Sequence, residues 1–373
     1  VEVELLPLSA ETIYFVPGEE RAAASAFEID MAARTLRTPY YEIAWNGQGR
    51  VVRLFDRENG REVLPEGAQA NALEVYEDKP VAHDNWDIDI FHLFKHEDAA
   101  LVREPVLVEN GALRAVIRFE YAYRRSTFVQ DMIVYADSRR IDFRTEAEWH
   151  ECHRVLKAGF PVDVRSTKAT YDIQYGHVER PTHFNTSWDY ARFEVVAHKW
   201  ADLSEQGYGV ALLNNCKYGH SVDENGLALT LLKSSTYPDP KADQGEHEFS
   251  YALLPHVGDW REGGVVDAAY AFNCPAEAIP GMRARDAGAF VRLEGEGAVV
   301  ESVKKAEDGG DVIVRLYECY GRRANVRLIP GFPFAQAHVC NILEENGEAA
   351  AVENGAIALS LKPYQIVTLR FGR

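Results

Sequence analysis

The chain has 373 residues, of which 46% are apolar and 26% charged, a composition typical of an ordinary globular protein. Its 40 Lys and Arg residues are outnumbered by 58 Asp and Glu residues. The resulting net charge of −18 argues against a nucleic-acid partner, whose phosphates require a basic face. No apolar run approaches the roughly 18 residues that a membrane helix needs, so no membrane association is expected.

The first residue is Val1 and not Met, so the chain is expected to be a piece of a longer protein. No basic-then-apolar leader is seen at its start. The sequence leaves open whether a signal peptide precedes Val1 in that protein. The five cysteines are odd in number and widely scattered, and no CxxC motif occurs. This pattern predicts reduced thiols in a cytoplasmic protein.

From the N-terminus onward, the chain predicts antiparallel strands almost throughout. Residues 1–36 are expected to hold two short strands, with PGEERAAASAF as a loop between them, and an all-β block follows from Thr38 to Asn273. Asn-Gly dipeptides favour tight hairpin turns because both residues tolerate positive φ. These dipeptides begin at Asn46, Asn59, Asn110, Asn225, Asn346 and Asn354. Apolar residues flank most of them, which indicates hairpins.

Period-two alternation marks two strands with one buried face each. The stretch RRIDFRTEAEWHE places on one face Ile141, Phe143, Thr145, Ala147 and Trp149. The stretch YQIVTLRF places on one face Val367, Leu369 and Phe371. No segment shows a helical stripe of 12 or more residues, and DAALVREP and GMRARDAGA are expected to form a turn or two of helix.

The stretch CPAEAIPGMRARDAGA, with two Pro and two Gly, is expected to be a linker. After it, strands are predicted near residues 298–304, 311–318, 324–329, 336–342 and 356–371. The predicted fold class is all-β, with a large many-stranded antiparallel sandwich followed by a small β-sandwich domain. The predicted divisions are a short joining β segment (1–36), the large sandwich (37–275) and the small domain (285–373).

The segment NTSWDYARFEV alternates from Trp188 onward and is expected to be a strand. One face would carry Trp188, Tyr190, Arg192 and Glu194, an unusual set for a face turned to solvent. Sugar sites have this composition, because aromatic rings cover the apolar face of a pyranose while polar groups bind its hydroxyls. The alternative is a sheet whose aromatic side chains pack under a loop, and spacing alone favours that alternative.

Three clusters resemble metal sites only weakly. The acidic stretch EDKPVAHDNWDIDIFH lacks the Gly and the ligand order of a calcium loop. His150 and His153 flank Cys152, and His96 and Asp98 form a pair, but neither set has evident further ligands. The motifs GxSxG, P-loop, GxGxxG and HExxH are absent, and among 58 acidic residues no catalytic pair stands out. The sequence therefore predicts no metal site and no catalytic residue in this chain.

Long segments in chain order resemble the C-terminal half of family 38 glycoside hydrolases, the zinc-dependent retaining α-mannosidases, nearest their bacterial and cytosolic branch. The resemblance is specific because it is collinear and covers nearly the whole chain from Thr38. The segments that carry it are TPYYEIAWNGQGRVVRLFDRENGREVL (38–64), ALEVYEDKPVAHDNWDIDIF (72–91), RIDFRTEAEWHECHRVLKAGFP (140–161), VERPTHFNTSWDYARFEVVAHKWADLSEQGYGVALLNNCKYGHSV (178–222), LTLLKSSTYPDPKADQGEHEFSYALLPHVGDW (229–260) and VKKAEDGGDVIVRLYECYGRR (303–323).

The resemblance implies a fold for this chain and indicates which domain of the family holds the catalytic residues. Family members have an N-terminal α/β barrel, a helical middle part and a β half, which consists of a large sandwich resembling galactose mutarotase and a small β domain. In the family, the nucleophilic Asp and most zinc ligands belong to the barrel, and a further zinc His precedes the β half. The resemblance therefore implies that this chain is a non-catalytic part without a cofactor, and zinc is expected in the catalytic domain outside it.

The resemblance also implies partners and a site. The intact enzyme is expected to hydrolyse α-mannosides. This chain is expected to pack on the catalytic barrel through an apolar, aromatic-rich surface. Homo-oligomers are a further expected kind of partner. We expect His183, Asn185 and Trp188 at the rim of the mannose pocket, with Asp189 and Arg192 supporting them from behind. The alternatives are a stand-alone sugar-binding module and a mutarotase-like sugar enzyme that uses His and Glu as acid and base.

Overall fold

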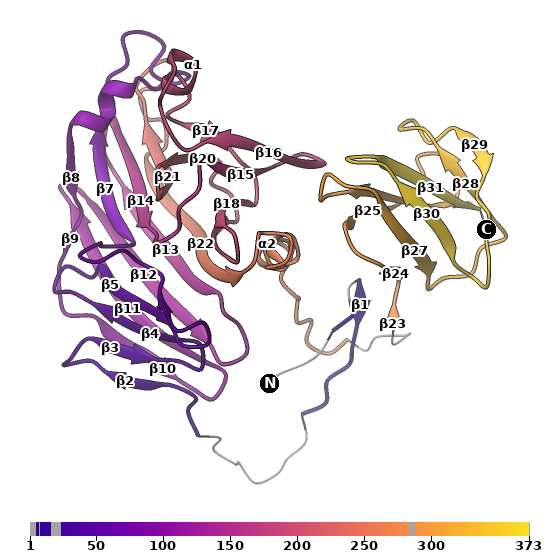
Figure 1. Cartoon of the computed structure of the whole chain (residues 1–373), viewed down its shortest axis with the longest axis horizontal. Coiled ribbons are helices and arrows are strands. Elements are labelled where there is room, and N and C mark those ends of the chain that lie inside the picture. The colour runs from indigo at the N-terminus through magenta and orange to yellow at the C-terminus, as the bar shows by residue number, and fades with distance from the viewer. Residues whose placement is uncertain (1–4, 7, 16–23, 283–287, 373) are drawn as a thin grey trace. The chain divides into compact units, whose positions relative to one another are not determined.

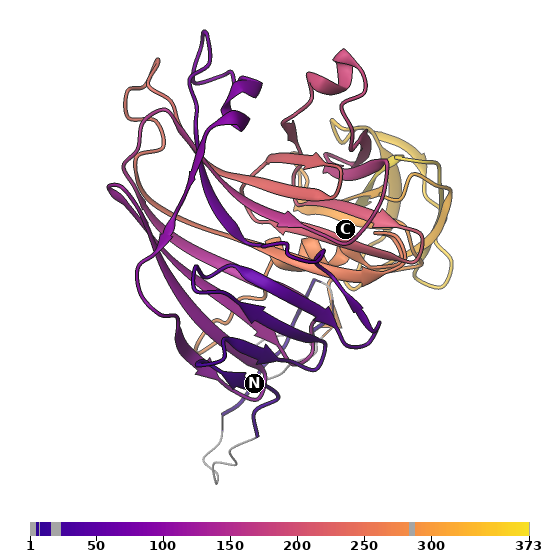
Figure 2. The same cartoon turned by 60° about the vertical axis from the view of Figure 1, so that its left-hand side comes forward.

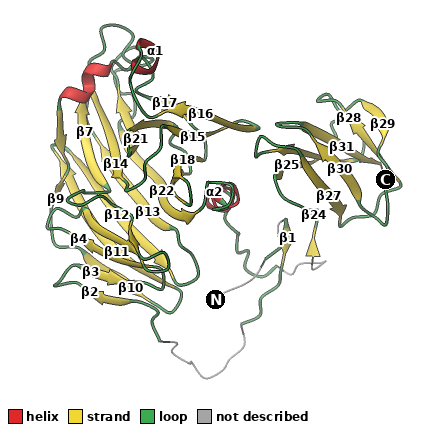
Figure 3. Cartoon of the chain, in the orientation of Figure 1, coloured by secondary structure: helices red, strands yellow, loops and turns green. Residues whose placement is uncertain are grey.

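The computed structural model describes residues 5–6, 8–15, 24–282 and 288–372. Strands hold 51% of the chain and helices 5%, as Figure 3 shows by colour, which confirms the all-β prediction. Within the described part of the chain, no helix is long and apolar enough to cross a membrane. The chain forms two compact units (Figure 1). The large unit comprises Arg21–Asp172 and Glu179–Pro275, and the small unit comprises Val1–Glu20, Ile173–Val178 and Ala276–Arg373.

A ten-stranded antiparallel sheet is the largest layer of the large unit. Its strands, in the order in which they pair, are β10 (Val106–Asn110), β11 (Arg114–Tyr123), β12 (Ser126–Tyr135), β13 (Ile141–Trp149), β22 (Gly245–Val257), β19 (Tyr208–Asn214), β18 (Trp200–Glu205), β15 (Lys168–Ile173) and β16 (Gly176–Pro181), with β9 (Ala100–Leu101) added on β11. The inward face of β13 is the predicted one, because all five residues that alternate along it are buried.

Two smaller sheets complete the large unit. The six-stranded sheet consists of β17 (Val195–Val196), β20 (Gly219–Asp223), β21 (Gly226–Ser234), β14 (Arg154–Pro161), β7 (Ala72–Glu77) and β8 (His96–Asp98). The five-stranded sheet consists of β2 (Glu28–Asp30), β3 (Thr35–Arg37), β4 (Tyr41–Trp45), β5 (Val51–Asp56) and β6 (Arg61–Glu62). Both pack on the ten-stranded sheet, since Phe160 contacts Phe143 at 5.7 Å between ring centroids and Trp45 contacts Phe119 at 6.1 Å.

The Asn-Gly signals mark turns at most of the predicted places. The dipeptides at Asn46, Asn59, Asn110 and Asn225 lie between consecutive paired strands. At Asn354 and Gly355, φ is 51° and 76°, so both central residues of this tight turn have the positive φ that the dipeptide favours. The dipeptide at Asn346 instead begins strand β29.

The helices are short, and the longer one was not predicted. Helix α2 (Val265–Asn273) packs on β18 and β19 through Val265, Val266 and Ala269. Nine residues are fewer than a sequence window needs to show a helical stripe. The stretch DAALVREP contains strand β9 and no helix, so that expectation was wrong. Residues 17–23 of the predicted N-terminal loop and residues 283–287 of GMRARDAGA lie outside the described residues.

The small unit contains three sheets and its own core. The two-stranded sheet pairs β1 (Ser9–Ala10) with β23 (Gly288–Ala289), and the three-stranded sheet contains β24 (Val291–Glu294), β27 (Ala324–Pro330) and β30 (Ile357–Leu361). The five-stranded sheet contains β25 (Ala298–Lys305), β26 (Val312–Glu318), β31 (Ile366–Gly372), β28 (Gln336–Cys340) and β29 (Asn346–Ala349). The predicted inward face of the last strand is buried in this core. The single strand expected at 356–371 is divided into β30 and β31 by a turn, in which Tyr364 has φ of 58°.

A buried polar network lies between the sheets of the large unit. The Gln130 amide accepts a hydrogen bond from Asn71 at 2.6 Å and donates to Thr145 at 2.9 Å and to the Tyr251 hydroxyl at 2.8 Å. The Tyr251 hydroxyl donates in turn to Asn71 at 2.6 Å. All four residues are almost fully buried, and such a network stabilises one arrangement of a core only while every member has its partners.

We expect Gln130→Ala to lower the free energy of unfolding by about 2–4 kcal/mol, because it leaves buried polar groups of Asn71 and Thr145 without partners. Urea denaturation followed by circular dichroism measures this change. The matched control is Gln48→Ala on the surface, for which a change within about 0.5 kcal/mol is expected. Equal effects of the two substitutions would contradict the role assigned to the network.

Candidate functional site

The segment from Thr182 to Val196 is a loop with one helical turn, and the predicted strand from Trp188 onward is wrong. Helix α1 (Ser187–Tyr190) begins after Thr186, whose side chain accepts a hydrogen bond from the Asp189 N–H at 3.2 Å. The Asp189 carboxylate accepts from the Thr186 N–H at 3.2 Å, which completes a capping box. This local signal prevails over the apparent alternation, and only β17 at the end of the segment is extended.

The structure brings some of the predicted site residues together. Trp188 lies on α1 with 75% of its surface exposed, and Asn185 and Arg192 on either side of the helix are exposed too. The Nδ1 atom of His183 lies 3.8 Å from the Asp189 carboxylate. Asp189 therefore holds the start of the helix and faces His183, while its role behind a sugar site stays a prediction. Sugar contact by His183, Asn185, Trp188 or Arg192 remains a prediction.

Just after α1, the segment is anchored on the six-stranded sheet by a buried ion pair. The Lys157 ammonium on β14 donates to Glu194 at 2.6 Å and to the Ser221 hydroxyl at 2.9 Å. The exposed fraction is 3% for the Lys157 side chain and 11% for that of Glu194, which also accepts a hydrogen bond from Thr230. Sequence analysis did not find this anchor, although a lysine inside the apolar stretch VLKAGF is a signal of a buried partner.

A second loop, residues 78–95, lies at the same end of the strands. It carries the 3-10 helix η1 (Ile90–Phe94), and Figures 1 and 2 both show η1 and α1 projecting from this end. The two loops touch, since the ring of His92 on η1 lies 5.8 Å from that of Phe193. His92 also packs on Tyr76 of β7 at 5.5 Å, so this loop covers part of the six-stranded sheet.

The acidic stretch in this second loop is used for hydrogen bonding within the protein. Asp84 accepts hydrogen bonds from the Thr236 N–H at 2.7 Å and the Tyr237 N–H at 3.1 Å. The Thr236 N–H is the main cause of a lowered pKa of the Asp84 carboxyl. Lys233 on β21 pairs with Asp78 at 2.6 Å, which ties the start of the second loop to that strand. These bonds fix residues 78–89 on the loop that follows β21.

Exposed apolar side chains lie on three loops: residues 182–196, residues 78–95 and the loop that follows β21. We call this set the apolar rim. Its members, each with at least 49% of its surface exposed, are Val81, Trp86, Phe91, Phe94, Trp188, Tyr190 and Tyr237. Single exposed apolar residues are ordinary, but seven on adjoining loops indicate a surface that contacts a partner or ligand. That such a surface packs on a catalytic barrel stays a prediction.

A hollow of about 370 Å³ lies elsewhere, on the face of the five-stranded sheet. Half of its lining residues are charged, and some of these pair with each other, as Arg37 does with Glu28 at 3.6 Å and Arg53 with Glu42 at 2.9 Å. No aromatic side chain lines it, so its chemistry is not that of a sugar site.

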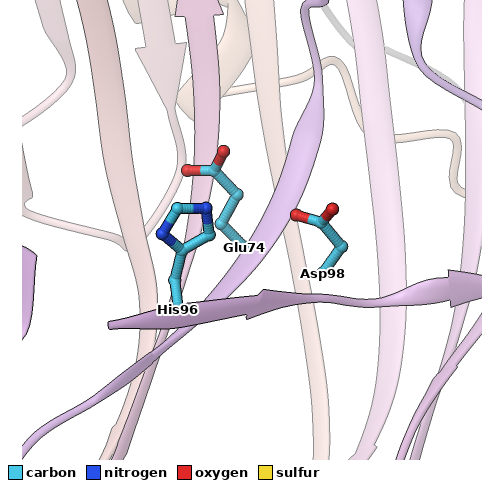
Figure 4. A group of neighbouring side chains, drawn as sticks. All are labelled: Glu74, His96 and Asp98. Atoms are coloured by element: carbon cyan, nitrogen blue, oxygen red, sulfur yellow. The ribbon is translucent and has the colours of Figure 1, made fainter. Parts of the chain in front are cut away.

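The two residue pairs that resembled metal ligands in the sequence, His150 with His153 and His96 with Asp98, differ in the contacts they make. His150 contacts Glu148 at 3.3 Å, whereas His153 faces Asp84 and Thr236, so these two histidines do not form a common site. Across the described ranges, one group of three residues places potential ligand atoms within 4.8 Å of one another, namely Glu74, His96 and Asp98 (Figure 4).

Comparison with known proteins gives two matches in chain order. Residues 36–241 match the model of the glycosyl hydrolases family 38 C-terminal domain, and residues 297–369 match that of the family 38 C-terminal beta sandwich domain. The chain belongs to glycoside hydrolase family 38. This confirms the resemblance inferred from the sequence segments.

Curated relatives in this family are longer than the chain. It is 38% identical to Alpha-mannosidase 2C1 of Homo sapiens over 353 residues, which cover 90% of this chain and 33% of the relative. It is 36% identical to Alpha-mannosidase G of Dictyostelium discoideum, over 89% of this chain and 32% of the relative. The family 38 chain thus spans about a third of the length of these relatives.

A solved structure has a similar fold. The crystal structure of an alpha-mannosidase from Enterococcus faecalis V583 matches with a TM-score of 0.77 and 16% sequence identity. The match covers 95% of this family 38 chain and 44% of the other chain. At this identity the likeness concerns the fold alone, and it agrees with the β-sheet fold described above.

Proposed function

We propose that this chain is the non-catalytic β-sandwich part of a retaining, zinc-dependent α-mannosidase that hydrolyses α-mannosidic bonds. The observation that carries the proposal is the family 38 match along both units, combined with a coverage of about one third of relatives named alpha-mannosidase. In this account, the nucleophile and the zinc ligands belong to a catalytic barrel outside the chain, and glycosyl transfer through a covalent intermediate takes place there.

The proposed role of the chain is to support that barrel and to close one side of the mannose pocket. We place His183, Asn185 and Trp188 at the pocket rim, with Asp189 and Arg192 behind them. The support is that α1 presents Trp188 to solvent on a loop held by the Lys157–Glu194 pair. A wall of this kind excludes water from the sugar and positions it, and loops on a rigid sheet commonly do so.

The partners follow from the same account. The apolar rim is the proposed contact surface for the barrel and for the α-mannoside, and homo-oligomers are a further proposal that light scattering on the intact protein tests. We also place the protein in the cytoplasm. The support is that Cys152, Cys216 and Cys274 are exposed thiols outside any disulfide, which suits a reducing compartment.

A second candidate function is a stand-alone carbohydrate-binding module, favoured by the exposed Trp86 and Trp188. Measurable binding of mannosides by this chain alone would support that candidate. A mutarotase-like enzyme needs an accessible His–carboxylate pair. Among the described residues, the shortest His–carboxylate contact, between His256 and Asp202 at 2.7 Å, is enclosed, since the exposed fractions of the two side chains are 3% and 1%. The contact of His150 with Glu148 at 3.3 Å is exposed, so this pair is the one that a mutarotase-like activity would have to use.

We expect this chain alone not to hydrolyse an aryl α-mannoside, whereas the intact protein does, because the proposed nucleophile lies outside the chain. The measurement is release of the aryl group by both proteins at equal concentration, with zinc added. Turnover by the chain comparable to that of the intact protein would contradict the proposed function and favour an independent enzyme.

A further inference from the structure

Strands β7 and β8 place four polar side chains on one face of the six-stranded sheet. Glu74 lies directly opposite Asp98 in the antiparallel register, and Tyr76 lies opposite His96. Residues two apart on a strand point to the same face, so all four share it. Figure 4 shows the carboxylate of Glu74 beside the His96 ring, with the Asp98 carboxylate pointing toward them.

The charges on this face are incompletely balanced. Opposed carboxylates on neighbouring strands repel each other unless a cation lies between them. Asp98 has such a partner, Arg50, at 2.6 Å. Lys157 is the cross-strand neighbour of Glu74 on β14, but its ammonium bonds to Glu194 and Ser221 instead. Among the described residues, no cation pairs with Glu74.

The remaining contacts hold the two carboxylates in place. The Tyr76 hydroxyl donates a hydrogen bond to Oε2 of Glu74 at 2.5 Å, and Arg50 bonds to Oδ2 of Asp98. One oxygen of each carboxylate has no bond to the described protein groups.

We propose that Glu74, His96 and Asp98 form a binding site for a divalent transition-metal ion, with Zn²⁺ and Mn²⁺ as the fitting ions. One imidazole nitrogen and two carboxylate oxygens suit these ions, whereas Ca²⁺ takes oxygen ligands. The potential ligand atoms lie within 4.8 Å of one another. A shared ion needs them at a spacing of roughly 3 Å, so the proposal requires these side chains to rotate toward one another when the ion binds. Tyr76 and Arg50 then orient the ligating carboxylates, as outer partners of metal ligands commonly do.

The sequence predicts no metal ligand set here, because His96 and Asp98 lack a third partner along the chain. Pairing of β7 with β8 supplies Glu74, which lies 22 positions before His96. The ion would bind at the base of the loop formed by residues 78–95, since β7 leads into that loop and β8, the edge strand of the sheet, leads out of it. Metal binding therefore clamps the two ends of a loop that carries four members of the apolar rim.

The first test is calorimetric titration of the chelator-treated chain with Zn²⁺ and, separately, with Mn²⁺. We expect a single site whose affinity falls at least about 10-fold in Glu74→Gln and in His96→Ala. The matched control is His150→Ala, which removes an exposed histidine that also contacts one carboxylate but has no second one, and it should keep the wild-type affinity. Circular dichroism verifies that all variants are folded.

The second test is amide hydrogen exchange of residues 78–95 with and without Zn²⁺. We expect slower exchange in the wild-type chain and in His150→Ala, and no change in His96→Ala. Two results would overturn the site: no binding up to about 1 mM metal, or binding that His96→Ala leaves unchanged. Binding without slower exchange would overturn the clamp. None of these outcomes depends on mannosidase activity, so they test this site separately from the proposed function.

Discussion

Replacing Lys157 by Met is expected to lower the free energy of unfolding of the large unit by about 3–5 kcal/mol. The substitution leaves the carboxylate of Glu194 buried on the sheet without its cation, and it removes a donor from Ser221. An unpaired buried charge is among the most destabilising features a single substitution creates. Urea denaturation followed by circular dichroism measures the loss.

Two further variants separate the anchor from a general effect of losing a lysine. Lys168→Met removes a lysine that is 58% exposed and pairs with Glu179, so we expect a change below about 1 kcal/mol. The double variant Lys157→Met with Glu194→Gln removes both charges, and we expect it to recover part of the stability that Lys157→Met loses. If Lys157→Met is as stable as Lys168→Met, the pair does not anchor the segment.

Trp188→Ala in the intact enzyme is expected to reduce kcat/KM for an α-mannoside by about 10- to 100-fold, equivalent to about 1–3 kcal/mol of transition-state binding. The reason is that Trp188 is proposed to cover the apolar face of the sugar at the pocket rim. Because its side chain is 75% exposed, the melting temperature should change little. Steady-state kinetics and a thermal melt of the same preparation provide the two measurements.

The control for this prediction is Leu343→Ala, a residue of the small unit with the same exposed fraction of 75%. It should leave both kcat/KM and the melting temperature near their wild-type values. An unchanged kcat/KM for Trp188→Ala would remove Trp188 from the pocket rim. A lowered melting temperature with unchanged kinetics would show that Trp188 packs in the interior of the intact enzyme.

Local patterns in the sequence were sufficient for much of the fold. The alternation from Ile141 to Trp149 identified β13 and its buried face, because one side of that strand packs on the other sheets. The turn at Asn354 and Gly355 could also be predicted from the sequence, since the dipeptide itself prefers the required φ values. Helix α2 was missed because its nine residues owe their helical form to packing on β18 and β19.

The candidate site was less accessible to sequence reasoning. The alternation from Trp188 onward suggested a strand, whereas the hydrogen bonds between Thr186 and Asp189 start a helix there. Lys157 and Glu194 are 37 positions apart, so only the folded sheet brings them together. Glu74 and the His96–Asp98 pair are likewise brought together only in the folded sheet, because their proximity depends on the register of two strands.

The reading frame upstream of the codon for Val1 tests the central claim most directly. If this chain is the β part of a family 38 α-mannosidase, sequencing should find several hundred further residues in the same frame, encoding an α/β barrel with a His-x-Asp zinc motif and a helical part after it. A start codon directly before Val1, with no such region in frame, would contradict the claim and leave the sugar-binding module as the better account.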